Sequence, residues 1–287
     1  MDKSVSIRMF SVEQREGHGV LFSAALRAIF ARELVARERE VEPEIVIRLE
    51  RLSDDAPVVR GEIMRLQSAN LPPKALSGEP AVRLGVGSIG HSAVFAYDRE
   101  IGALALQVAR SGITPARIAL YVEALHGSPY DVWPILNADS WTKIRHGRIR
   151  AARIRLATPS DLRAADDDAR SIKQGLRRLK EATDTHYLDV SFTMGRGDPD
   201  LDRARTMRLF RWFHAEREAG RGDVKRLAAS VSDGEKTEIL NLIGAQMGAT
   251  ARLELPDDDP TASYELRSQF ALDSLHAHRD ELVEQLG

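Results

Sequence analysis

The sequence predicts an α+β protein with a mixed, largely antiparallel sheet, flanking helices and a C-terminal helix. Short stretches in which apolar and polar residues alternate, the pattern of half-buried strands, recur along the chain. Longer stretches between them carry apolar residues every three or four positions, which is typical of amphipathic helices. A two-residue turn signal, Asp233-Gly234, favours an antiparallel hairpin.

The first half of the chain is expected to be rich in strands. Alternation predicts strands at residues 5–12, 44–52, 58–67, 91–97, 103–108 and 130–136. Helical spacing of apolar residues predicts a helix over residues 20–40, which ends before Pro43. A second helix is expected to begin at Thr114, whose side chain can cap the first turn. Pro115 then takes the first helical position, where an N–H would have no partner within the helix. This helix runs to about residue 125.

The second half is expected to mix strands and helices more evenly. Strands are predicted at residues 143–156, 187–194, 223–232 and 249–255, and helices at residues 160–183, 201–218 and 261–285. Residues 235–240 form either the returning strand of a hairpin or the start of a short helix. Pro159 breaks the chain, so we expect a sheet-based α+β domain over residues 1–158 and an α+β domain with a terminal helix over residues 159–287. Whether the two share one core stays open.

The composition excludes several classes of protein. The chain has 287 residues, 43% of them hydrophobic, which is enough for a sizeable core. It has no cysteine, which excludes disulfides, zinc–thiolate sites, iron–sulfur clusters and cysteine nucleophiles. The first residues lack the apolar stretch of a signal peptide. No window approaches the roughly 18 to 20 apolar residues that span a bilayer. We therefore expect a cytoplasmic protein without membrane insertion.

Positive charge is concentrated in one part of the chain. Residues 143–226 contain 21 Lys and Arg against 13 Asp and Glu, a balance of +8, whereas the remainder contains 20 and 30, a balance of −10. This asymmetry indicates a positive surface on an otherwise acidic molecule. A surface of this kind suits a polyanion, and nucleic acid is the polyanion we expect.

The densest positive charge lies in residues 143–156. Six cations and no acid occur within thirteen positions, namely Lys143, Arg145, Arg148, Arg150, Arg153 and Arg155. From Arg148 onward polar and apolar residues nearly alternate, with one slip at Ala151-Ala152, which predicts a strand with one basic face. These six residues are the first candidate DNA-binding group, and they would contact phosphates with little sequence preference. The alternative is an edge strand whose charges prevent pairing with other sheets.

A second candidate group lies on the helix expected over residues 201–218. A helical wheel gathers Arg205, Arg208, Arg211 and Trp212 on one side, opposite a broad apolar side. An aromatic ring among arginines can stack on a base while its neighbours hold phosphates. The alternative is that Trp212 packs under the arginine stems of an ordinary solvated face. The DNA-binding hypothesis requires both groups to lie on one side of the molecule or of its dimer.

No residue pattern predicts catalysis. The stretch Gly85-Val-Gly-Ser-Ile-Gly90 matches a dinucleotide-binding pattern but precedes an expected hairpin, which offers no helix N-terminus to a pyrophosphate. His276 and His278, two apart on a helix, point too far apart to share a metal. Acidic clusters at residues 166–168 and 257–259 are explained by a helix start and a loop. We expect no enzyme, cofactor or metal; a metal-dependent nuclease or a regulatory scaffold for an acidic protein stay as alternatives.

The order of elements resembles that of the RexA-type phage-exclusion proteins and, more distantly, of the DNA-binding component of the Kiwa defence system. The resemblance rests on the stretches Ala93-Val-Phe-Ala-Tyr-Asp98, Val132-Trp-Pro-Ile135, Leu188-Asp-Val190 and Asp233-Gly234, together with the basic strand and the closing helix. It covers most of the chain but includes no exclusive motif, so it transfers no functional residue. It implies a homodimeric, sequence-independent DNA-binding protein of antiviral defence or abortive infection, with a second defence-system protein as a further partner class.

Overall fold

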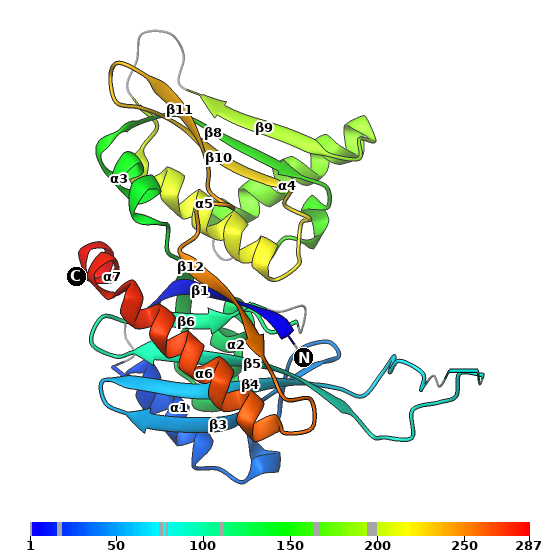
Figure 1. The fold of residues 1–287 in the computed structure, drawn as a ribbon. Helices are drawn as coiled ribbons and strands as arrows, with labels where there is room; N and C mark the ends of the chain where they lie inside the picture. The colour runs from blue at the N-terminus through cyan, green and yellow to red at the C-terminus, as the bar shows by residue number, and fades with distance from the viewer. Residues whose placement is uncertain are drawn as a thin grey trace. The chain divides into compact units, whose positions relative to one another are not determined.

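The computed structural model describes residues 2–15, 19–74, 77–78, 80–108, 112–163, 167–193 and 200–287, without the side chains of residues 167 and 168. The described chain forms two compact units, shown in Figure 1. Unit 1 comprises Met1–Val132 and Ala249–Gly287, and unit 2 comprises Trp133–Gly248. Both contain helices and antiparallel strands, so the predicted α+β class with flanking helices and a C-terminal helix is confirmed.

Unit 1 is built on an eight-stranded sheet. Its strands are β1 (Asp2–Gln14), β2 (Arg39–Glu42), β3 (Ile45–Asp55), β4 (Val58–Gln67), β5 (Ile89–Asp98), β6 (Ala103–Gln107), β7 (Tyr130–Pro134) and β12 (Gly248–Glu254). Seven of them follow the order β12-β1-β6-β5-β4-β3-β2, and β7 pairs with β1. The run from β1 through β6, β5, β4 and β3 to β2 is antiparallel, as expected for strands joined mostly by short turns.

Helices cover both faces of this sheet. The helices α1 (Phe22–Phe30) and α2 (Pro115–His126) bury apolar side chains against one face, together with Phe10, Ile47 and Phe95 of the strands. The long helix α6 (Pro260–Ala277) crosses the other face over β4, β5 and β6, and α7 (Arg279–Leu286) ends the chain (Figure 1). Thr114 caps α2 as predicted, because its side chain accepts a hydrogen bond from the Arg117 N–H at 3.3 Å.

The helix expected over residues 20–40 is much shorter. It ends at Phe30, and the following residues form the 3₁₀ turn Leu34–Arg37 and then strand β2. Arg39 and Glu40 pair with Ile47 and Val46 of β3. Pairing with a strand that comes later in the chain therefore overrides the helical spacing of the local sequence.

In its described residues, unit 2 is a four-stranded antiparallel sheet with three α-helices. Its strands, in the order β11-β10-β8-β9, are β8 (Arg148–Leu156), β9 (Leu188–Thr193), β10 (Arg226–Ser232) and β11 (Thr237–Asn241). Its helices α3 (Ala138–His146), α4 (Asp167–Thr183) and α5 (Arg203–Glu218) lie on one face of the sheet in Figure 1. The core between the layers joins Ile154 and Leu227 of the strands to Phe210 and Phe213 of α5. Residues 237–241 are the returning strand of the hairpin, which decides between the two expectations for this segment.

The compact units do not follow the expected division at Pro159. Strand β8 ends at Leu156 and is hydrogen-bonded on one side to β9 and on the other to β10. A boundary at Pro159 would separate β8 from both of these neighbours. The unit boundaries fall instead after Val132 and after Gly248, because the sheet of unit 1 takes β12 from the C-terminal part of the chain.

Candidate nucleic-acid interface

The basic strand predicted from the sequence is β8, and it lies inside the sheet of unit 2. It pairs with β9 over residues 151–156 and with β10 over residues 148–155. The alternative of a protected edge strand is therefore wrong for β8, because both of its sides are hydrogen-bonded. The slip at Ala151-Ala152 is a β-bulge: Ser230 of β10 lies opposite Ala151 and Val231 lies opposite Ile149, which leaves Arg150 as the extra residue.

The bulge keeps the arginines on one face of the sheet. Ile149, Ala152, Ile154 and Leu156 belong to the core beneath the sheet. The alternate positions form the other face, which we call the open face. It consists of Arg148, Arg150, Ala151, Arg153 and Arg155 of β8; Asp189, Ser191 and Thr193 of β9; Arg226, Ala228, Ser230 and Ser232 of β10; and Thr237, Ile239 and Asn241 of β11.

The open face is cationic and hydroxyl-rich. The helices α3, α4 and α5 lie on the opposite face of the sheet (Figure 1). The side chains of Arg148, Arg150 and Arg155 are 67%, 39% and 47% exposed. Serine, threonine and asparagine side chains on the neighbouring strands β9, β10 and β11 add hydrogen-bond donors that suit phosphate oxygens. The face as a whole can therefore hold several phosphates side by side.

Among the described residues, the carboxylates of Asp189 and Asp200 meet the arginines of the open face. Asp189, opposite Arg155 in the pairing of β8 with β9, accepts hydrogen bonds from Arg155 Nε at 3.1 Å and Nη2 at 2.5 Å. Asp200 lies within 3.3 Å of Arg148 Nε and 3.4 Å of Arg150 Nη1. Within the described chain, Arg153 and Arg226 have no ion pair.

Arg226 is a member of the site that the sequence-based selection missed. It lies directly opposite Arg155, so it extends the cationic surface from β8 onto β10. A signal was present, because Arg226 begins an alternating segment in which Leu227 and Ala229 face the core. That signal identifies a polar position, but only the pairing of β10 with β8 brings it to the same surface.

Lys143 and Arg145 do not lie on the basic strand. Residues 138–146 form α3, which begins at Asn137, where the side-chain oxygen accepts from the Ser140 N–H at 2.9 Å. The Lys143 ammonium contacts Asp139 at 2.8 Å and Glu238 at 3.0 Å. Hydrogen bonds to these two carboxylates raise the pKa of Lys143 above its ordinary value. Its charge is largely compensated within unit 2, and the continuous basic strand begins only at Arg148.

The second predicted group lies on α5, and its aromatic member is buried. Trp212 is 7% exposed, and its indole Nε1 donates to the Arg163 carbonyl oxygen at 2.9 Å. Its ring centroid lies 4.6 Å from that of Phe213 in the core. The structure thus differs from the stacking role expected for Trp212, because a base cannot reach a ring packed in this way. Arg211 lies over the ring of Trp133 at 5.9 Å.

The two predicted groups lie on opposite sides of unit 2. Phe210 and Phe213 direct one side of α5 to the core, toward the inner face of the sheet. Arg205 and Arg208 are exposed away from that core, whereas the arginines of β8 occupy the open face beyond the sheet. The sheet and the helix layer therefore separate them, and within unit 2 they cannot form one footprint.

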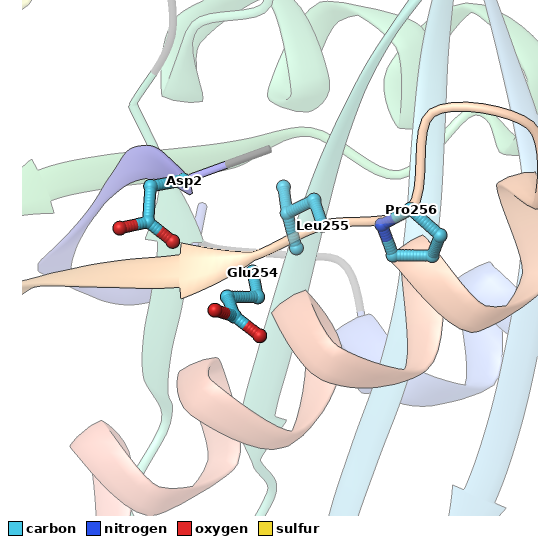
Figure 2. A pocket seen from close by; sticks show the side chains of 4 residues that line it. All are labelled: Asp2, Glu254, Leu255 and Pro256. Carbon is cyan, nitrogen blue, oxygen red and sulfur yellow. The ribbon is translucent and has the colours of Figure 1, made fainter.

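The remaining candidates from the sequence are a glycine-rich stretch and clusters of acidic residues. Gly85–Gly90 leads into β5, a strand, as the hairpin expectation required. Among the described residues, no group of three or more histidine, aspartate or glutamate side chains could hold a metal ion. The acidic residues 166–168 lie outside the residues whose side chains are described. Figure 2 shows a pocket in unit 1 lined by Asp2, Glu254, Leu255 and Pro256, whose two carboxylates do not suit a polyanion.

Neither the search for membrane-spanning helices nor the comparison with known proteins points to a function beyond what the geometry of unit 2 indicates. In the part of the chain that the structure describes, no helix has the length and apolar character needed to cross a bilayer. No protein-family model matches the sequence, and no curated protein is significantly similar to it. The resemblance to the RexA-type and Kiwa proteins therefore stays a prediction.

Proposed function

We propose that unit 2 binds the phosphate backbone of duplex DNA on its open face, without catalysis and with little sequence preference. The observation that carries this proposal is the row of arginines on β8, Arg148, Arg150, Arg153 and Arg155, extended by Arg226 on β10, on a sheet face that no described helix covers. Arginine is the side chain best suited to bidentate contacts with phosphate.

The side chains around the arginines favour duplex over single-stranded ligands. Proteins that hold single strands stack bases on exposed aromatic rings. The described open face has no aromatic residue, and Phe192 of β9 points to the core side with Val190. A face without rings can bind phosphates and sugars but offers no stacking platform. Affinity is then expected to come from ion contacts and to depend steeply on salt.

The test is binding of a fluorescent random-sequence duplex by the full chain, measured by anisotropy at two salt concentrations. R153E/R155E/R226E is expected to lower the affinity by about a hundredfold or more at low salt, because three contacts become repulsive. The slope of log affinity against log salt is expected to shrink by about 2.7, since each phosphate contact contributes about 0.9. Wild-type protein that does not bind at low salt would refute the proposal.

A matched control distinguishes an effect of the open face on affinity from an effect of the net charge. R83E/R178E/R252E reverses three exposed arginines elsewhere and changes the net charge by the same amount. We expect it to weaken binding only a few-fold, through the long-range field. Equal losses in the two triple variants would show that the open face is not the site.

The same assay decides between the remaining alternatives. Degradation of the duplex only when Mg²⁺ is present would favour the metal-dependent nuclease. Lack of binding to DNA together with salt-sensitive binding to an acidic polypeptide would favour the scaffold.

The roles in defence against phage, the homodimer and the second defence-system protein extend the proposal and rest on the resemblance alone.

A further inference from the structure

Among the described residues, one carboxylate on the open face and one at its end are already paired with arginines. Asp189 accepts two hydrogen bonds from Arg155, at 3.1 Å from Nε and 2.5 Å from Nη2. Asp200 is shared between Arg148 and Arg150 at the opposite end of β8, at 3.3 Å and 3.4 Å. Arg153, toward the middle of β8, and Arg226, opposite Arg155, have no ion pair within the described chain.

A carboxylate held by two guanidinium N–H groups occupies the position that a phosphate would take. Carboxylate and phosphate oxygens are both recognised by the planar fork of arginine. One edge of the Arg155 guanidinium, formed by Nε and Nη2, is therefore occupied in the free protein. Asp189 and Arg155 are 46% and 47% exposed, so water and a ligand can reach the pair and separate it.

We propose that Asp189 and Asp200 are built-in competitors of phosphate that set the affinity of the open face. In the free protein they hold Arg155, Arg148 and Arg150 in place, and a bound backbone displaces them. This inference rests on the proposed function. A ligand first meets Arg153 and Arg226, which need no displacement, and the arginines paired with Asp189 and Asp200 follow. Small anions contact one or two arginines and gain little, whereas a polyanion contacts the whole row.

The expected effect is moderate, because solvent-exposed ion pairs are weak. Separating one such pair, together with the repulsion between the carboxylate and a phosphate, is expected to reduce affinity about three- to fivefold. Replacing each aspartate by asparagine removes the charge and keeps the size of the side chain. D189N is thus expected to bind the duplex about three- to fivefold more tightly, and D189N/D200N about tenfold or more.

The experiment compares the full-chain variants by anisotropy with one random-sequence duplex at one salt concentration. D257N is the matched control, because Asp257 also forms an exposed ion pair, with Lys3 at 2.7 Å in unit 1, and its loss changes the net charge equally. A second comparison introduces D189N into R155A. There the gain from D189N is expected to fall to about twofold or less, because the pair that it releases no longer exists and only the repulsion between the carboxylate and a phosphate remains.

The outcomes separate this inference from the proposed function. If wild-type protein binds and D189N binds no more tightly than D257N, the inference fails and the proposed function stands. If D189N binds more weakly, Asp189 positions Arg155 for the ligand and does not compete with it, and the inference fails as well. If neither wild-type protein nor any variant binds at low salt, both the proposed function and this inference fail. Unchanged thermal unfolding of D189N shows that the comparison reports binding alone.

Discussion

The sheet of unit 1 has helices on both faces, whereas the sheet of unit 2 has helices on one face and arginines on the other. Both sheets carry arginine–carboxylate contacts, but in different surroundings. In unit 1, Arg267 of α6 donates to Glu62 Oε1 of β4 at 2.8 Å and to Gln107 of β6 at 3.1 Å, and both Arg267 and Glu62 are buried. In unit 2 the contacts are open to solvent.

This contrast separates two uses of the same side chain. Removing one partner of a buried pair leaves an uncompensated charge in a poorly solvated place, so Arg267 is expected to matter for stability. An exposed pair contributes little to stability, so the arginines of the open face are available for a ligand. Burial, more than the presence of a carboxylate, therefore distinguishes the structural arginine from the candidate binding arginines.

The largest expected effect is that of R267M. Among the described residues, the change leaves Glu62 with Arg51, at 3.2 Å, and it is expected to lower the free energy of unfolding of unit 1 by about 3–5 kcal/mol. R153M on the open face is expected to change it by less than about 0.5 kcal/mol. All three tryptophans, at positions 133, 141 and 212, belong to unit 2. In denaturant unfolding, tryptophan fluorescence therefore follows unit 2, whereas circular dichroism follows both units, and the two signals together separate the units. Equal losses of stability in R267M and R153M would contradict the contrast.

Alkaline pH is expected to weaken unit 1 selectively. Burial raises the pKa of Tyr97 and of Tyr121 to about 12, from 10.0. Because the folded-state pKa lies above the unfolded value, the stabilisation is complete below pH 10 and is lost as the pH rises toward 12, by about 2 kcal/mol for each residue. The measurement is denaturant unfolding at pH 9, 10 and 11. Y121F should show a smaller pH dependence than wild type, and an unchanged dependence would exclude Tyr121 as its cause.

An added carboxylate on the open face is expected to have a smaller effect. Ser191 is exposed on β9 directly opposite Arg153, so S191E would give Arg153 the kind of partner that Asp189 provides for Arg155. Affinity for duplex DNA is expected to fall about three- to tenfold, with little change in stability. S191Q controls for size. Equal affinities of S191E and S191Q would indicate that Arg153 does not contact the ligand.

The smallest effect is expected on the helix side of unit 2. R205E/R208E reverses two charges that lie away from the open face, and affinity is expected to fall less than about threefold, through the long-range field. The variant R153E/R155E, with the same change in net charge, is the matched comparison. A loss as large as that of R153E/R155E would mean that α5 carries a binding surface of its own.

Local sequence patterns predicted the structure correctly where contacts between nearby residues determine it. The bounds of β4 at residues 58–67 and the cap at Thr114 follow from alternation and from capping chemistry within a few residues. The basic face of β8 follows likewise, since even its slip at Ala151-Ala152 marks a real bulge. The helix α3 was missed although Asn137 is a good cap and Asp139 and Lys143 form an i,i+4 pair.

Features that depend on distant segments could not be predicted. The interior place of β8 depends on β10, which begins at Arg226, about seventy residues further along the chain. The burial of Trp212 depends on the carbonyl of Arg163 and on the core beside Phe213, whereas the helical wheel placed it among arginines. A wheel gives directions around a helix axis but does not identify which direction faces another layer.

The bulge at Arg150 also affects the form of the surface. A bulge bends its strand and increases the right-handed twist. The arginines on its two sides, Arg148 on one and Arg153 and Arg155 on the other, therefore point along diverging directions, and the cationic surface is curved. Deletion of Ala151 would restore strict alternation while every arginine keeps its face. Curvature and charge can thus be varied one at a time in this protein, which allows complementarity of shape to a helical ligand to be measured apart from electrostatic attraction.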